Sequence, residues 1–85
     1  MDAATRVAAE LGALVAGTRR DLGLAQQELA ALVGVDRQYL SEIERGKVTN
    51  HLARLVRILD AVGLALTAVP RTSALGVDDS RGDAR

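Results

Sequence analysis

The chain has 85 residues, a length that suits one small domain with a modest core. Its composition is 48% hydrophobic, with one Tyr and no Phe, Trp or Cys, which excludes disulfides and thiolate metal sites and favours an all-α fold. The formal net charge is zero, so charge neither indicates nor excludes a nucleic-acid partner, and no apolar run reaches the roughly 18 residues that a membrane helix needs.

The first predicted helix covers residues 5–22, with Asp2 or Thr5 as its N-terminal cap and Gly23 as its end. Apolar or small residues recur there at helical spacing. The expected stripe consists of Leu11, Leu14, Val15, Thr18 and Leu22.

Two short helices follow. Residues 26–33 form the second, which Gly34 ends, and Asp36 caps a third over residues 37–45, which Gly46 ends. The inward side of the second helix is expected to consist mostly of Leu29, Ala30, Leu32 and Val33.

The fourth helix is predicted over residues 50–62, between the cap Thr49 and the terminal Gly63. Its apolar stripe consists of Leu52, Leu55, Val56 and Leu59. These four helices place the folded domain in residues 1–63.

The pattern then changes, because residues 64–70, LALTAVP, alternate in polarity and predict a short strand ended by Pro70. A single strand needs a partner for its backbone groups, and the same strand of a second copy could supply it, which would make a homodimer. The alternative is an irregular segment that packs on the fourth helix. Residues 71–85 hold few large apolar groups and are expected to form a flexible tail.

A helix-turn-helix unit is predicted from Gln26 onward. Where two short helices cross steeply, a small residue is needed at the contact and a glycine at the turn, and Ala30 and Gly34 occupy these places. The remaining apolar positions of the unit are Leu29, Val33, Val35, Leu40 and Ile43. The match of all seven positions in register makes this a strong signal.

The third helix has one polar arc, because about 100° per residue brings five long or polar side chains together. They are Arg37, Gln38, Ser41, Glu42 and Arg45, with Tyr39, Leu40 and Ile43 on the opposite arc. In a helix-turn-helix protein this helix enters the major groove, where Arg37 suits guanine, Gln38 suits adenine and Glu42 can accept from cytosine. The alternative is an ordinary solvated face.

On these residues, the segment LGLAQQELAALVGVDRQYLSEIERGK resembles the Xre/Cro-like phage-repressor family over residues 11–64, and the segment RLVRILDAVGLALTAV most resembles HipB-like antitoxins. The resemblance implies a four- to five-helix domain with a short C-terminal strand that pairs across a homodimer. The strand residues would be Leu64, Leu66, Thr67 and Val69.

The resemblance also implies residue roles. Arg37, Gln38 and Glu42 would read bases, and Arg19 and Glu44 would form a structural ion pair. Contacts to the DNA backbone would come from Gln26, Tyr39, Ser41, Arg45 and Lys47. Ala25 departs from the family pattern, which has Thr or Ser there as a helix cap.

The implied function is that of an antitoxin: a dimeric repressor of its own operon, in the cytoplasm at the bacterial nucleoid, that also binds and neutralises a HipA-like kinase toxin. A repressor without a toxin partner, or an interaction module that has lost DNA binding, are the alternatives. The partners are therefore operator DNA, a second copy and the toxin, with no membrane.

No catalytic residue, metal ligand or cofactor is expected. His51 has no second ligand nearby in the sequence, and Ser41 has no base placed to activate it, so an enzyme is not predicted. Arg54 and Arg57 share one face of the fourth helix and could be solvated or could contact DNA flanks or an acidic partner.

Overall fold

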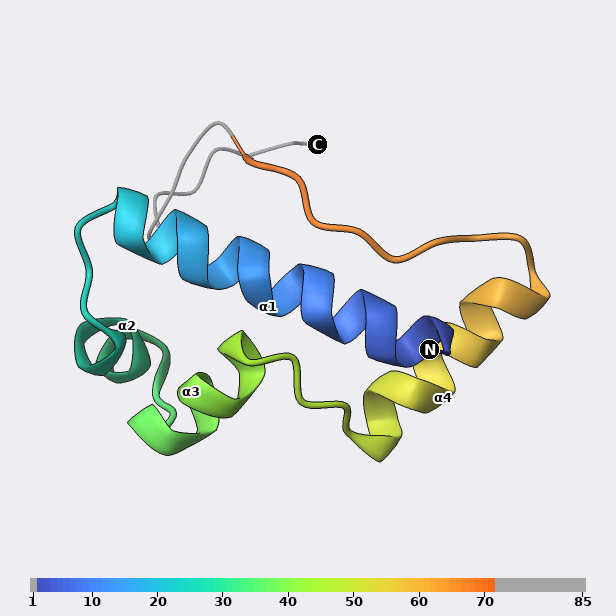
Figure 1. Cartoon of the computed structure of the whole chain (residues 1–85), viewed down its shortest axis with the longest axis horizontal. Coiled ribbons are helices and arrows are strands. Elements are labelled where there is room, and N and C mark those ends of the chain that lie inside the picture. The colour runs from blue at the N-terminus through green and yellow to red at the C-terminus, as the bar shows by residue number, and fades with distance from the viewer. Residues whose placement is uncertain (1, 72–85) are drawn as a thin grey trace, which may run out of the picture.

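The computed structural model describes residues 2–71, and the proposed flexible tail from residue 72 onward lies outside them. Four α-helices follow one another: α1 (Ala3–Asp21), α2 (Gln26–Val33), α3 (Arg37–Glu44) and α4 (Asn50–Ala61). The prediction of an all-α fold is confirmed over this part of the chain. In Figure 1 the long α1 lies above α2, α3 and the start of α4.

Side-chain caps fix where three of the four helices begin. Asp2 Oδ1 accepts the backbone N–H of Thr5 at 2.8 Å, which resolves the choice between Asp2 and Thr5 as the cap of α1. Asp36 and Thr49 cap α3 and α4 in the same way, as predicted. Only α2 lacks a side-chain cap, because Ala25 has no acceptor.

The turn between α2 and α3 depends on Gly34. Its φ of +79° lies in the left-handed region that other residues adopt at a cost. This conformation lets the N–H of Val35 donate to the carbonyl of Ala30 at 3.0 Å and closes α2. The chain therefore reverses into α3 within a few residues.

The core lies where α1 packs against α3 and α4 and where α2 packs against α3. The inner side of α1 consists of Ala4, Ala8, Gly12 and Ala16, which are all buried. The predicted stripe of α1 is therefore partly wrong, because Leu14 and Leu22 are 48% and 44% exposed. Small residues every fourth position let α3 approach α1 more closely than a leucine stripe would allow.

The inward side of α2 was also only partly predicted. Ala30 is buried and Leu29 half-buried, but Leu32 and Val33 are 64% and 60% exposed. The reason is that α2 packs mainly on α3, so that the rest of its surface is left uncovered. The stripe of α4 is as predicted, with Val56 buried and Leu52, Leu55 and Leu59 half-buried.

The predicted strand at residues 64–70 is absent from the single chain. Within residues 2–71 no strand occurs, and the segment after α4 is an extended coil that passes the other side of α1 in the view of Figure 1. Its backbone groups meet no neighbouring strand, which a strand requires. Leu64 and Val69 are 57% and 74% exposed, so the segment does not pack firmly on α4 either.

Candidate nucleic-acid interface

The first turn of α3 projects polar side chains away from the core. The cap at Asp36 fixes where the helix begins, since its Oδ1 accepts the N–H of Tyr39 at 2.8 Å. Leu40, which is 7% exposed, anchors the inner side. Arg37 and Gln38 then lie on the outer side and are exposed. A rigid helix with an exposed polar first turn is the geometry that reading a DNA groove requires.

The end of α3 is held by both preceding helices through Glu44. Arg19 on α1 donates from Nε to Glu44 Oε2 at 2.7 Å and from Nη2 to Oε1 at 3.0 Å. The two side chains are only 10% and 5% exposed. Gln26, at the start of α2, donates to the same Oε1 at 2.9 Å, and Arg19 Nη1 donates to the Leu24 carbonyl at 2.8 Å.

This network shifts the pKa values of both Glu44 and Arg19. The hydrogen bonds from Arg19, with a smaller contribution from Gln26, lower the pKa of Glu44 below its ordinary value. The carboxylate in turn raises the pKa of Arg19. The charged pair therefore ties the orientation of α3 to α1 and to the start of α2.

A second set of contacts lies on the outer side of α3. Lys47 Nζ lies 3.0 Å from Glu42 Oε1, and Gln38 Nε2 lies 3.4 Å from Glu42 Oε2. Arg45 donates to the hydroxyl of Ser41. These contacts join five of the predicted DNA-contacting residues in two groups, Gln38 with Glu42 and Lys47, and Ser41 with Arg45.

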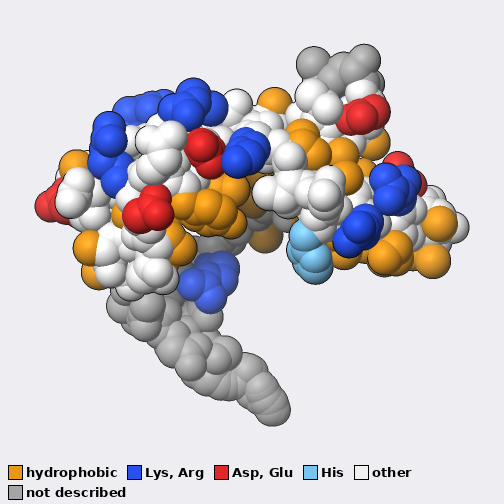
Figure 2. Space-filling model, turned by 90° about the horizontal axis from the view of Figure 1, so that it is seen from below, with side chains coloured by type: hydrophobic (Ala, Val, Ile, Leu, Met, Phe, Trp, Pro, Cys, Tyr) orange, Lys and Arg blue, Asp and Glu red, His pale blue; other side chains and the backbone are white. Residues whose placement is uncertain are grey.

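Figure 2 views the molecule from below and so presents the side on which α3 lies. Lys and Arg side chains lie toward both ends of this face and near its middle, with hydrophobic side chains and some Asp and Glu side chains among them. Basic groups spread along one face can contact the phosphates of a duplex at several points.

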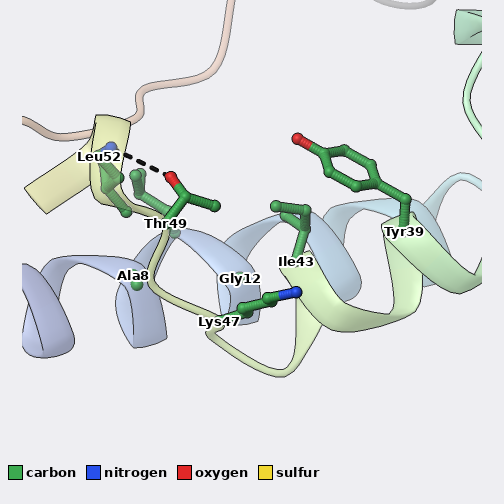
Figure 3. A pocket seen from close by; sticks show the side chains of 8 residues that line it. Ala8, Gly12, Tyr39, Ile43, Lys47, Thr49 and Leu52 are labelled. Atoms are coloured by element: carbon green, nitrogen blue, oxygen red, sulfur yellow. Dashed lines mark hydrogen bonds between the residues drawn. The ribbon is translucent and has the colours of Figure 1, made fainter.

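A shallow apolar groove runs between α1, α3 and the start of α4. Its lining residues are Ala8, Leu11, Gly12, Tyr39, Ile43, Lys47, Thr49 and Leu52. Figure 3 shows the ring of Tyr39 and the ammonium group of Lys47 at its edge, with the Thr49 hydroxyl accepting the N–H of Leu52 at 3.1 Å. Two of the predicted backbone-contacting residues therefore border an apolar surface.

The other predicted residues lie elsewhere. Gln26 lies beside Glu44 rather than among the outer residues of α3. Leu64, Thr67 and Val69 are exposed on the segment after α4, and Leu66 is half-buried. His51, Arg54 and Arg57 are exposed on α4. In residues 2–71 no group of three or more potential metal ligands occurs, and no helix there is long and apolar enough to cross a membrane.

Two features of the site were not predicted. The hydrogen bond from Gln26 to Glu44 joins residues 18 apart in the sequence, and Gly12 meets the backbone of the last turn of α3. Both contacts arise where two helices cross, and residues close in the sequence do not indicate which helices will cross. An Ala- and Gly-rich spacing of four along residues 4–16 is the one signal that could have indicated the close approach at Gly12.

Comparison with known proteins identifies helix-turn-helix proteins as relatives of this chain. The helix-turn-helix family pattern matches residues 18–69, from the last turn of α1 to the segment after α4. The chain is 33% identical over 58 residues to the uncharacterized HTH-type transcriptional regulator y4mF of Sinorhizobium fredii, covering 68% of this chain and 76% of the relative.

Two further relatives come from distant sources. The ImmF control region 10 kDa protein of Bacillus phage phi105 is 34% identical over 74 residues, which is 87% of this chain and 82% of the phage protein. An uncharacterized HTH-type transcriptional regulator of Methanothermobacter thermautotrophicus is 42% identical over 50 residues, which is 59% of this chain and 72% of that protein. No solved structure matches.

Proposed function

This chain belongs to the Xre-type helix-turn-helix family of DNA-binding transcriptional regulators, and we propose that it represses transcription by placing α3 in the major groove of an operator. The observation that carries the proposal is the arrangement of α3. Leu40 and Glu44 fix the helix to the domain, while Arg37 and Gln38 project from its first turn into solvent. Repression of this kind involves no catalysis and takes place at the nucleoid.

In this proposal the contacts divide into two kinds. Arg37 and Gln38 meet base edges, where bidentate hydrogen bonds distinguish guanine and adenine. Contacts to phosphate and sugar come from Tyr39, Ser41, Arg45 and Lys47, and from the second amide N–H of Gln26.

The test is a titration of the protein on the DNA immediately upstream of its own gene, with a scrambled duplex as competitor. Arg37→Ala and Gln38→Ala are each expected to weaken specific binding by about 1 to 3 kcal/mol while the circular dichroism spectrum stays unchanged. Arg6→Ala is the matched control, because Arg6 is an exposed arginine on α1, away from α3. Unchanged specific affinity in both α3 variants would contradict the proposed role of α3, and no specific binding by the natural protein would favour an interaction module.

We further propose that the regulator is a homodimer. Among the described residues, the buried apolar side chains are four alanines, Leu40 and Val56, so the core contains few large side chains. Exposed apolar side chains instead follow one another along the end of α4 and beyond: Ile58, Val62, Leu64 and Val69, at 57% to 74% exposure. A second copy that covers this region would complete the core, and pairing of residues 64–70 between copies is one way to do so.

An antitoxin role is the second proposal. It rests on the resemblance to HipB-like antitoxins, and the exposed Leu32 and Val33 on α2 favour it, because the DNA contacts proposed here leave these two side chains uncovered. The expected partner is a HipA-like kinase encoded beside this gene. Co-purification of the neighbouring gene product with the tagged full chain tests it, with Leu32→Glu as the variant expected to reduce capture. A neighbouring gene product that does not bind would leave a repressor without a toxin.

A further inference from the structure

Glu42 occupies a predicted base-reading position, yet both of its carboxylate oxygens are already engaged within the protein. Oε1 lies 3.0 Å from Lys47 Nζ, and Oε2 accepts a longer hydrogen bond of 3.4 Å from Gln38 Nε2. The side chain is 30% exposed. A carboxylate whose two oxygens already accept hydrogen bonds within the protein is poorly placed to accept another from the amino group of cytosine.

The charge of Glu42 is secured by the same contacts. The hydrogen bond from Lys47, followed by that from Gln38, lowers the pKa of Glu42 below its ordinary value. The group is therefore ionised at neutral pH, and an ionised carboxylate only accepts hydrogen bonds. The Lys47 ammonium group balances a negative charge that would otherwise face the phosphates of the DNA.

The ionised Glu42 carboxylate determines the orientation of the Gln38 side-chain amide. Because Glu42 can only accept, Gln38 must turn its NH2 group toward the carboxylate, which leaves the amide oxygen and the second N–H to face outward. Adenine presents one donor and one acceptor in the major groove, at N6 and N7, which match this pair. Guanine presents two acceptors there, so that its O6 would meet the amide oxygen.

We infer that Glu42 reads no base itself but is a positioning residue, which orients Gln38 so that it selects adenine over guanine at one base pair of the operator. This replaces the base-reading role predicted for Glu42 from the sequence. The inference rests on the proposed function, since a base preference exists only if α3 reads DNA.

The test is selection of preferred sequences from a pool of duplex DNA with a randomised segment, by the full chain and by two variants. Gln38→Ala locates the base pair that Gln38 reads, as the position where the adenine preference disappears. Glu42→Ala is expected to lose the preference at that same base pair, from about 5- to 150-fold down to about threefold or less. The preferences elsewhere in the site are expected to stay.

Two further variants separate positioning from structural damage. Glu42→Gln keeps a carbonyl acceptor for Gln38 Nε2 and is expected to restore most of the adenine preference. Lys47→Ala keeps the contact between Gln38 and Glu42, so it is expected to weaken binding to all sequences alike and to reduce the salt dependence. Thermal melts by circular dichroism establish that each variant is folded.

Different outcomes overturn different claims. If Glu42→Ala loses a preference at another base pair than Gln38→Ala does, then Glu42 reads its own base, and the inference is wrong while the proposed function stands. If Glu42→Ala keeps the full adenine preference, the inference is likewise wrong. If the full chain selects no sequence at all, the proposed function fails and the inference fails with it.

Discussion

Gly12 sets the distance between α1 and α3. A Cβ atom at this position would lie 2.9 Å from the carbonyl oxygen of Glu44 and would also collide with that of Ile43. Both obstacles are backbone atoms of the last turn of α3, so they cannot rotate out of the way. The glycine is therefore required for the close crossing of α1 and α3.

The first residue-scale prediction concerns this glycine. Gly12→Ala is expected to lower the free energy of unfolding by about 1 to 3 kcal/mol, although Ala normally favours a helix over Gly. Gly17→Ala is the matched control on the same helix, because a Cβ there meets nothing within 4 Å. Urea unfolding is expected to show the control variant unchanged or stabilised by up to about 1 kcal/mol. Equal effects of the two substitutions would argue against a close crossing at Gly12.

The second residue-scale prediction is a pH dependence centred on Glu44. Arg19, and secondarily Gln26, lower the pKa of this carboxyl below its ordinary value of 4.5. A lowered folded-state pKa means that the network stabilises the protein above the unfolded-state value and loses this contribution as pH falls through the folded-state value. Glu44→Gln is therefore expected to be less stable than the natural protein at pH 7.

The comparison across pH isolates this group, because Glu42 and Asp2, whose pKa values are also lowered, are present in both proteins. Urea unfolding at a series of pH values from neutral to strongly acidic is expected to show the difference between Glu44→Gln and the natural protein shrinking below the ordinary carboxyl range. A difference that stays constant with pH would mean that the glutamate acts through packing and not through its charge.

At the scale of elements, the sequence predicts what local chemistry decides. The bounds of α2 and the caps Asp36 and Thr49 could be predicted, because each depends on residues within a few positions of one another. The buried side of α1 could not, because Ala and Leu together make several sides of that helix apolar. The positions of α3 and α4 decide between them, and they select Ala8, Gly12 and Ala16 over Leu14.

The same distinction applies to the site. That Arg37 and Gln38 share one side of α3 follows from helical spacing alone. The contact between Glu42 and Lys47 depends on how the chain turns after α3, and the contact between Gln26 and Glu44 depends on how α2 crosses α3. The location of these residues could therefore be predicted, but their hydrogen-bond partners could not, and their roles toward DNA stay predictions.

The start of α2 provides the element-scale prediction. Ala25 has the extended backbone of a capping residue, with φ −74° and ψ 158°, but no acceptor for the free N–H groups, while Glu28 Oε1 accepts its backbone N–H at 2.7 Å. Ala25→Ser would add the missing half of this reciprocal arrangement. The variant is expected to gain about 1 kcal/mol in the free energy of unfolding. Thr49→Ala, which removes an existing cap, is expected to lose a similar amount in the same urea titration.

At the scale of the whole molecule, the core of the described residues is built largely from alanine, which is a reason to expect the proposed homodimer. Two recognition helices of a symmetric dimer would meet successive major grooves about 34 Å apart, so the operator is expected to be a palindrome with half-sites one turn apart. Residues 64–70 form no strand in the single chain, so pairing of this segment with a second copy stays a prediction.

Two variants distinguish the surfaces that could hold the dimer. Truncation after Leu64 removes most of the predicted strand but keeps the hydrogen bond from Leu64 N to the Leu59 carbonyl, 2.8 Å long, that closes α4. Ile58→Glu instead places a charge on the exposed side of α4. If pairing of residues 64–70 holds the dimer, sedimentation velocity should show monomers for the truncated chain and dimers for Ile58→Glu. The reverse result would place the interface on α4. Monomers in both cases, beside a dimeric natural chain, would mean that α4 and the strand form one continuous interface, and a monomeric natural chain would contradict the homodimer.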